Sequence, residues 1–244
     1  MKTWLPLLLA MVAAAVSGCG FRSCCSVAEP VPFLAGMEEA DSIKEVFSPV
    51  FRSDTLSPAM REAIGPLPKG SPVRFGDLRV LTLSHYGFDG KPHLGQMVCN
   101  KAVADDLLEI FERLFDLRYQ IRSIRPVSDF GGSDTASMEA DNTSCFNCRR
   151  VDGMSRWSSH AMGMAVDINP LENPWVRGSR VKPQSALQYA DRTRDFPHKL
   201  TTEDPAVRLF RSKGFVWGGS WRSVKDWQHF EKPLQDSKQA APGE

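Results

Sequence analysis

Two short segments far apart in the chain contain residues that could together bind a metal ion and hydrolyse an amide bond. The first contains His160 and Asp167, and the second contains Asp226 and His229 in a D-x2-H spacing. Two imidazoles and one carboxylate suit zinc, and three protein ligands leave a fourth coordination position for water. If His160, Asp167 and His229 converge, the sequence therefore predicts a catalytic zinc site rather than a structural one.

Hydrolysis at such a site also needs an acid that lies near the metal without binding it. Asp226, three residues before His229, is the predicted general base, because its carboxylate could take the proton of the attacking water. Glu231 is the alternative, since it lies two residues after His229 and would share its face in an extended segment. The spacing alone does not decide whether Asp226 or Glu231 is the general base.

The sequence around these residues resembles the zinc D-alanyl-D-alanine carboxypeptidase family, which is VanY-like and includes L-alanyl-D-glutamate endopeptidases. The pattern S-x-H-x-x-G-x-A-x-D-I occurs at Ser158–Ile168, and the strings WGGSW and DWQHF follow near His229. The longer forms HAxGxAxDINP and DNTSxFNCR point to an extended-motif subgroup. The resemblance extends over residues 75–233. It implies that His160, Asp167 and His229 bind one zinc ion and that Asp226 is the base.

The same resemblance suggests which residues contact the substrate. The family carries a substrate-holding arginine where this chain has Arg149, and an arginine fork can grip a carboxylate or an oxyanion. Asn147 and Ser158 are further candidates, although Ser158 could equally be a turn residue. Trp217 either lines the cleft or packs in the core.

The pattern of apolar residues predicts an α+β domain with an antiparallel sheet flanked by helices, as in the fold of hedgehog and DD-peptidase domains that the resemblance implies. The expected helices cover residues 58–64, 103–115 after a cap at Asn100, and 205–211. The expected strands cover residues 78–84 and 96–99 as a hairpin, 121–127, 164–168 and 215–217. Residues 133–150 and the stretch with Arg177 and Arg180 read as loops.

The N-terminus reads as an export signal. Lys2 precedes an apolar run from Leu5 to Val16 that is too short to span a bilayer comfortably, and small residues then lead to Cys19. The string VSGC resembles a lipobox, which implies cleavage before Cys19 and its acylation. The alternative is an ordinary secretory signal with an incidental cysteine.

These features predict four segments: a signal peptide at 1–18, a tether at 19–54, a zinc peptidase domain at 55–233, and a disordered tail at 234–244. The expected location is the cell envelope, with a lipid anchor on the periplasmic side of a membrane. Gly20, where an Asp would favour inner-membrane retention, leaves the outer membrane open.

The charge balance argues against a nucleic-acid partner, because 30 Lys and Arg residues are matched by 29 Asp and Glu residues. In an exported protein Cys145 could pair with Cys148 or Cys99, although the sequence does not assign the connectivity. The predicted function is hydrolysis of amide bonds in peptidoglycan stem peptides, of the D,D-carboxypeptidase type. The alternatives are an L-alanyl-D-glutamate endopeptidase and, from another class, a non-catalytic zinc-containing module that binds the cell wall.

Overall fold

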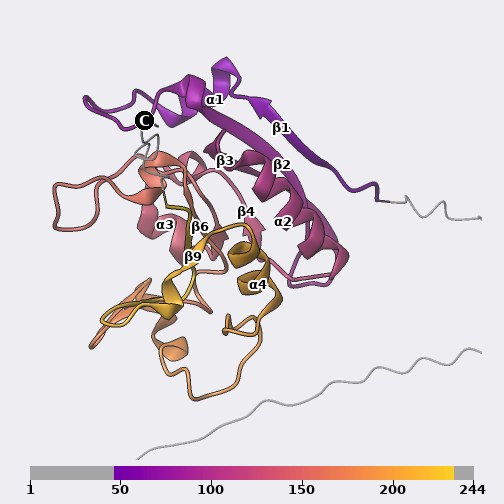
Figure 1. Cartoon of the computed structure of the whole chain (residues 1–244), viewed down its shortest axis with the longest axis vertical. Coiled ribbons are helices and arrows are strands. Elements are labelled where there is room, and N and C mark those ends of the chain that lie inside the picture. Colours follow the sequence, from indigo (N-terminus) through magenta and orange to yellow (C-terminus); the bar gives the residue numbers. More distant parts are fainter. Residues whose placement is uncertain (1–46, 234–244) are drawn as a thin grey trace, which may run out of the picture. The chain divides into compact units, whose positions relative to one another are not determined.

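The computed structural model describes residues 47–233 (Figure 1). The predicted signal peptide, Cys19, most of the predicted tether and the predicted tail lie outside these residues. The predicted boundary at residue 54 falls inside the first strand, β1 (Phe51–Thr55), which pairs antiparallel with β2 (Leu78–Tyr86). The ordered domain therefore starts earlier in the sequence than expected.

The first sheet has the order β1-β2-β3, where β3 spans Pro92–Asn100. Strands β2 and β3 form the predicted hairpin, with Leu78 opposite Asn100 and Tyr86 opposite Pro92. Helix α1 (Pro58–Ile64) connects β1 to β2. Ser57 caps it, Pro58 starts it and Gly65 ends it, as the sequence predicted.

Helix α2 (Ala104–Asp116) packs along this sheet (Figure 1), and its buried positions recur at helical spacing. The helix itself was predicted correctly, but its cap was not. Val103 occupies the N-cap without a side-chain hydrogen bond. Asn100 lies before it, where its Oδ1 accepts from the Ala102 backbone nitrogen at 3.0 Å and its Nδ2 donates to the Met162 carbonyl oxygen at 2.9 Å. Asn100 thus ties the end of β3 to the segment that contains His160.

Two expectations for the middle of the chain were wrong. The predicted strand at 121–127 is reduced to β4 (Ser123–Ile124), and the predicted loop at 133–150 contains α3 (Asp134–Glu139) and β5 (Asn142–Thr143). Strands β4 and β5 pair in parallel. Such short elements depend on long-range pairing, and a window of a few residues carries little signal for them.

The remaining strands form two further small sheets, with the orders β6-β11-β9 and β10-β7-β8. Their bounds are β6 Ala165–Asp167, β7 Trp175–Arg177, β8 Arg180–Lys182, β9 Val216–Trp217, β10 Lys225–Asp226 and β11 His229–Glu231. Helix α4 (Pro205–Ser212), capped by Asp204, was predicted. The described residues thus have the expected α+β mixture, with three small antiparallel sheets in place of the single sheet expected.

The larger of two hydrophobic core clusters joins these parts. It contains Leu81 and Met97 from the first sheet, Phe111 from α2, and Val166 and Phe230 from the central strands β6 and β11. All five side chains are buried. The strands that carry Asp167 and His229 are therefore fixed by packing on their apolar residues, and this packing limits movement of the polar side chains between them.

Candidate metal centre

His160 lies in a 3-10 helix, Ser159–Met162, that enters strand β6 through Gly163. Gly163 has a φ of 65°, and a Cβ there would lie 2.6 Å from the Asn100 backbone nitrogen. A glycine is therefore required by both conformation and space. The close approach places His160 beside the end of β3.

Asp167 and His229 face each other directly across the β6–β11 pair. Opposed residues of an antiparallel pair point to the same side of the sheet, so the two side chains meet although they are 62 residues apart. Strand pairing brings the second segment to the first, as the zinc hypothesis required.

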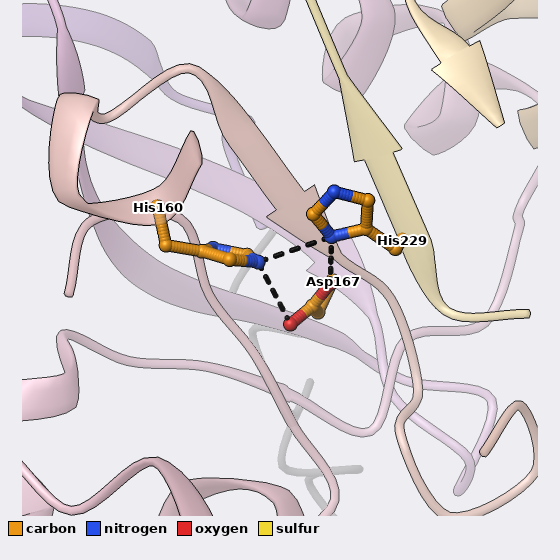
Figure 2. A group of neighbouring side chains, drawn as sticks. All are labelled: His160, Asp167 and His229. Atoms are coloured by element: carbon orange, nitrogen blue, oxygen red, sulfur yellow. Dashed lines mark hydrogen bonds and ion pairs between the residues drawn. The ribbon is translucent and has the colours of Figure 1, made fainter. Parts of the chain in front are cut away.

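The three side chains converge on one point (Figure 2). His160 Nε2 lies 3.1 Å from His229 Nδ1 and 3.2 Å from Asp167 Oδ2, and His229 Nδ1 lies 3.0 Å from Asp167 Oδ1. Ligands bound to zinc at about 2.0–2.1 Å in a tetrahedron lie roughly 3.3–3.4 Å apart. The spacing of these donor atoms therefore fits a single zinc ion closely.

The outer edges of both imidazoles are held by hydrogen-bond acceptors. His160 Nδ1 lies 2.7 Å from the Cys145 carbonyl oxygen and donates its proton there, which leaves the Nε2 lone pair facing the cluster. His229 Nε2 lies 3.5 Å from Glu231 Oε2, and Ser159 donates a hydrogen bond to the same carboxylate. These contacts orient the rings as the outer neighbours of metal ligands do.

The electrostatic environment favours a cation at this position. Burial works to raise the pKa of Asp167, but the two neighbouring imidazoles outweigh it and hold the carboxyl ionised. Burial works to lower the pKa of His229, but hydrogen bonds to Asp167 and Glu231 raise it to about 10. The carboxylates around His229 thus stabilise a positive charge at this position, which either a proton or a metal ion can supply.

Asp226 lies beside this cluster on β10. Its Oδ1 atom is buried without a hydrogen-bond partner, and burial raises the pKa of its carboxyl to about 7, while the nearby His229 works to lower it. Gly218 makes room for it, because a Cβ there would lie 2.8 Å from the Asp226 Cβ. An unpartnered acid with a pKa near neutrality is able to accept and release a proton.

Glu231 occupies a different position. Its hydrogen bond to His229 holds the pKa of its carboxyl at about 2, and it faces the edge of His229 that points away from the cluster. Its Oε2 atom is shared between His229 and Ser159. These contacts make Glu231 a positioning residue for His229 and favour Asp226 as the base.

Arg149 and Asn147 share a hydrogen-bond partner, Asp134, that the sequence did not predict. Asp134, in the first turn of α3, accepts from Arg149 Nη2 at 2.8 Å and from Asn147 Nδ2 at 3.2 Å. The Asn147 backbone nitrogen also donates to the His160 carbonyl oxygen at 3.1 Å. The Arg149 side chain is therefore ordered close to the ligand segment, and no local pattern could have shown that Asp134 orders it.

The other two predicted substrate residues have structural roles. Ser158 is buried and caps the His160 helix, where its Oγ accepts from the His160 backbone nitrogen at 3.3 Å. Trp217 is only 2% exposed, and its Nε1 donates to the Trp227 carbonyl oxygen, so its ring has no surface for a substrate. Of the two alternatives for Trp217, this burial favours packing in the core over lining the cleft. Trp221, whose ring centre lies 5.5 Å from that of His229, is the tryptophan beside the cluster.

The described cysteines form no disulfide: Cys99 and Cys145 are buried thiols, and Cys148 is a half-buried one. Burial raises the pKa of Cys99 to about 12. Cys145 donates to the Gly163 carbonyl oxygen at 3.3 Å and so contributes to the same junction as Asn100.

In the part of the chain that the structure describes, no helix is long and apolar enough to cross a membrane.

The fold and site together define an α+β protein with a buried His-Asp-His group able to hold one metal ion. Residues 152–232 match the family model described as D-alanyl-D-alanine carboxypeptidase. The matched segment contains His160, Asp167, Asp226 and His229 but neither Asn147 nor Arg149, and it covers less than half of the chain. No curated protein and no solved structure matched the chain. The match supports the predicted family in the C-terminal part of the domain and does not extend to the DNTSCFNCR string.

Proposed function

We propose that this protein is a zinc peptidase that hydrolyses amide bonds in peptidoglycan stem peptides, of the D,D-carboxypeptidase type. One observation carries the proposal: His160 Nε2 and His229 Nδ1 lie 3.1 Å apart, and each lies within 3.2 Å of one carboxylate oxygen of Asp167. The family match over the same residues supports the reaction class. A zinc ion bound there would supply Lewis-acid activation of water and of the scissile carbonyl.

Proton transfer is assigned to Asp226. Its carboxyl lies in the field of His160, Asp167 and His229, and burial raises its pKa to about 7. A group with this pKa can take the proton of an attacking water and later pass it to the leaving amine at neutral pH. Glu231 is held away from the cluster by His229 and Ser159, which supports Asp226 over Glu231.

Substrate holding is assigned to Arg149 with Asn147. Asp134 uses one oxygen for Arg149 Nη2 and the other for Asn147 Nδ2. Arg149 Nη1 also donates to the Arg150 carbonyl oxygen at 3.4 Å, so two of the five guanidinium N–H donors are used and the half-exposed side chain keeps Nη donors for a substrate group. Charge-assisted bonds of this kind suit a carboxylate or the oxyanion of the tetrahedral intermediate.

The test is mass spectrometry of muropeptides incubated with the zinc-loaded protein. Release of the terminal D-alanine is the expected result. Cleavage between L-alanine and D-glutamate would instead select the endopeptidase alternative. Fully zinc-loaded protein that releases no product from any stem peptide would contradict the proposal and leave the non-catalytic wall-binding module.

We also propose that Cys19 is acylated after cleavage of residues 1–18 and anchors the domain beside its polymeric substrate. The VSGC string motivates this proposal. The mass of the mature N-terminal peptide tests it: a diacylated or triacylated Cys19 is expected, and an unmodified N-terminus at another residue would contradict it.

A further inference from the structure

The small sheet β10-β7-β8 connects the candidate base to a basic surface. Asp226 on β10 is opposite Trp175 on β7, and Trp175 is opposite Lys182 on β8. Opposed residues point to the same side of a sheet, so these three side chains share one face. The expectation that this stretch is a loop was wrong, and the hairpin gives its basic residues fixed positions.

The next pair on the same face consists of two arginines. Arg177 is two residues after Trp175 and lies directly opposite Arg180. Val181, between Arg180 and Lys182, is buried on the other face. The face that includes Asp226 thus continues outward through Trp175 and Lys182 to Arg177 and Arg180 at the tip of the hairpin.

This arrangement is unfavourable for the hairpin alone. Like charges directly opposite each other destabilise an antiparallel pair. Both arginines are exposed, and neither makes an ion pair with any residue between 47 and 233. Lys182 differs from them, because its ammonium pairs with Asp152 and lies 5.8 Å from the Trp175 ring. An external anion would relieve the repulsion between the two guanidinium groups.

We propose that Arg177 and Arg180 bind carboxylates of an acidic peptide strand that extends from the bond being cut across Trp175. This inference rests on the proposed function. Arg177 and Arg180 lie on the same sheet face as Asp226, so a substrate strand bound at Asp226 is the ligand that would reach them. Strand spacing of about 4.8 Å and a rise of about 3.3 Å per residue place the arginine pair roughly 8–12 Å from Asp226. About three residues of an extended peptide span that distance. Planar guanidinium groups suit carboxylates at its far end.

The experiment measures binding separately from cleavage. In the full-length, zinc-loaded Asp226→Ala protein, the Kd for a muropeptide with free carboxylates is compared with the Kd for the same muropeptide with its carboxylates amidated. The test variant adds Arg177→Gln and Arg180→Gln. The matched control adds Lys69→Gln and Arg194→Gln, which remove two exposed positive charges outside this sheet.

We expect the arginine variant to bind the acidic muropeptide about three- to tenfold more weakly, as two exposed ion pairs predict. Its Kd for the amidated muropeptide, and both Kd values of the control variant, should stay unchanged. The loss should shrink as salt is added. A further outcome is that zinc-loaded wild-type protein cleaves no muropeptide while the arginine variant still binds the acidic muropeptide more weakly than its parent does. That result would contradict the proposed peptidase activity and support carboxylate binding by Arg177 and Arg180.

Two results would overturn the inference. One is an equal Kd for the acidic muropeptide in the arginine variant and in its parent. The other is tighter arginine-dependent binding to phosphate-rich wall polymer, or to vesicles of anionic phospholipid, than to the acidic muropeptide. Either result would show that Arg177 and Arg180 do not bind the substrate peptide.

Discussion

The Nε2 atom of His160 lies 3.1 Å from the Nδ1 atom of His229, across 69 residues of sequence. Two ring nitrogens at this separation share either a proton or a metal ion. Asp167 lies within 3.2 Å of both nitrogens and supplies the third donor. This contact is the basis of the first prediction.

Replacing His160 with Ala should remove tightly bound zinc, because two remaining ligands do not define a zinc site. Metal analysis of the purified protein should find about one zinc per wild-type chain and almost none in the variant. His93→Gln is the control, since His93 is exposed and pairs with Asp89. Chelation should lower the Tm of the wild type and leave that of His160→Ala unchanged. Full zinc occupancy in His160→Ala would exclude His160 as a ligand.

Replacing Asp226 with Ala should leave zinc bound and lower kcat by about 10²–10⁴, the usual range for loss of a general base. The same assay on Glu231→Gln separates the two acids. Glu231 lies behind His229, so its replacement should weaken zinc binding more than it lowers the kcat of the loaded enzyme. The assignment of the base fails if Asp226→Ala cleaves muropeptides at the wild-type rate.

Replacing Asp134 with Ala should release Arg149 and Asn147 and raise KM more than it lowers kcat, because Asp134 positions the two donors without contacting the metal. Ser133→Ala is the matched control. It removes the cap of the same helix, where Ser133 Oγ accepts from the Ala136 backbone nitrogen, and leaves the Arg149 pair intact. Equal kinetic effects in the two variants would reduce the role of Asp134 to helix stability.

Replacing Gly163 with Ala should lower the free energy of unfolding by about 2–4 kcal/mol, because a left-handed conformation and a backbone clash are combined. Gly131→Ala is the control. Gly131 has a similar φ of 64° but no atom within 4 Å of the added Cβ, so about 1–2 kcal/mol is expected. Denaturant unfolding measures both. Equal losses would show that the approach to Asn100 relaxes at little cost.

The buried pair of Asp141 and Glu172 should make stability depend on pH. Burial, together with the Asp141 carboxyl, raises the pKa of Glu172 from 4.5 in the unfolded chain to about 8. Burial also raises the pKa of Asp141. The folded state therefore holds a proton that the unfolded state releases, and the free energy of unfolding should fall as pH rises from about 4.5 to 8.

Glu172→Gln should flatten this fall, because the amide keeps the shape of the side chain and does not ionise. Thermal unfolding at several pH values measures the slope. An unchanged slope in Glu172→Gln would place the titrating group elsewhere.

Much of the fold was predictable from short stretches of sequence. Helix α1 is delimited by Ser57, Pro58 and Gly65, and the buried face of α2 follows from residues three and four apart. These signals are local because caps and helical periodicity act within a few residues. The family resemblance, which the C-terminal match supports, selected His160, Asp167, Asp226 and His229 as one group.

Only the tertiary structure decided which partners these residues have. Local sequence carried no sign that Asp134 would order Arg149 or that Glu231 would lie behind His229, and it left open whether Trp217 lines the cleft or packs in the core. Strand register and burial arise from contacts between distant segments, and a pairing shift of one residue would turn every side chain to the opposite face. The sequence thus determined which chemical groups are present, whereas the β6–β11 and β10–β7–β8 pairings determined which of them meet.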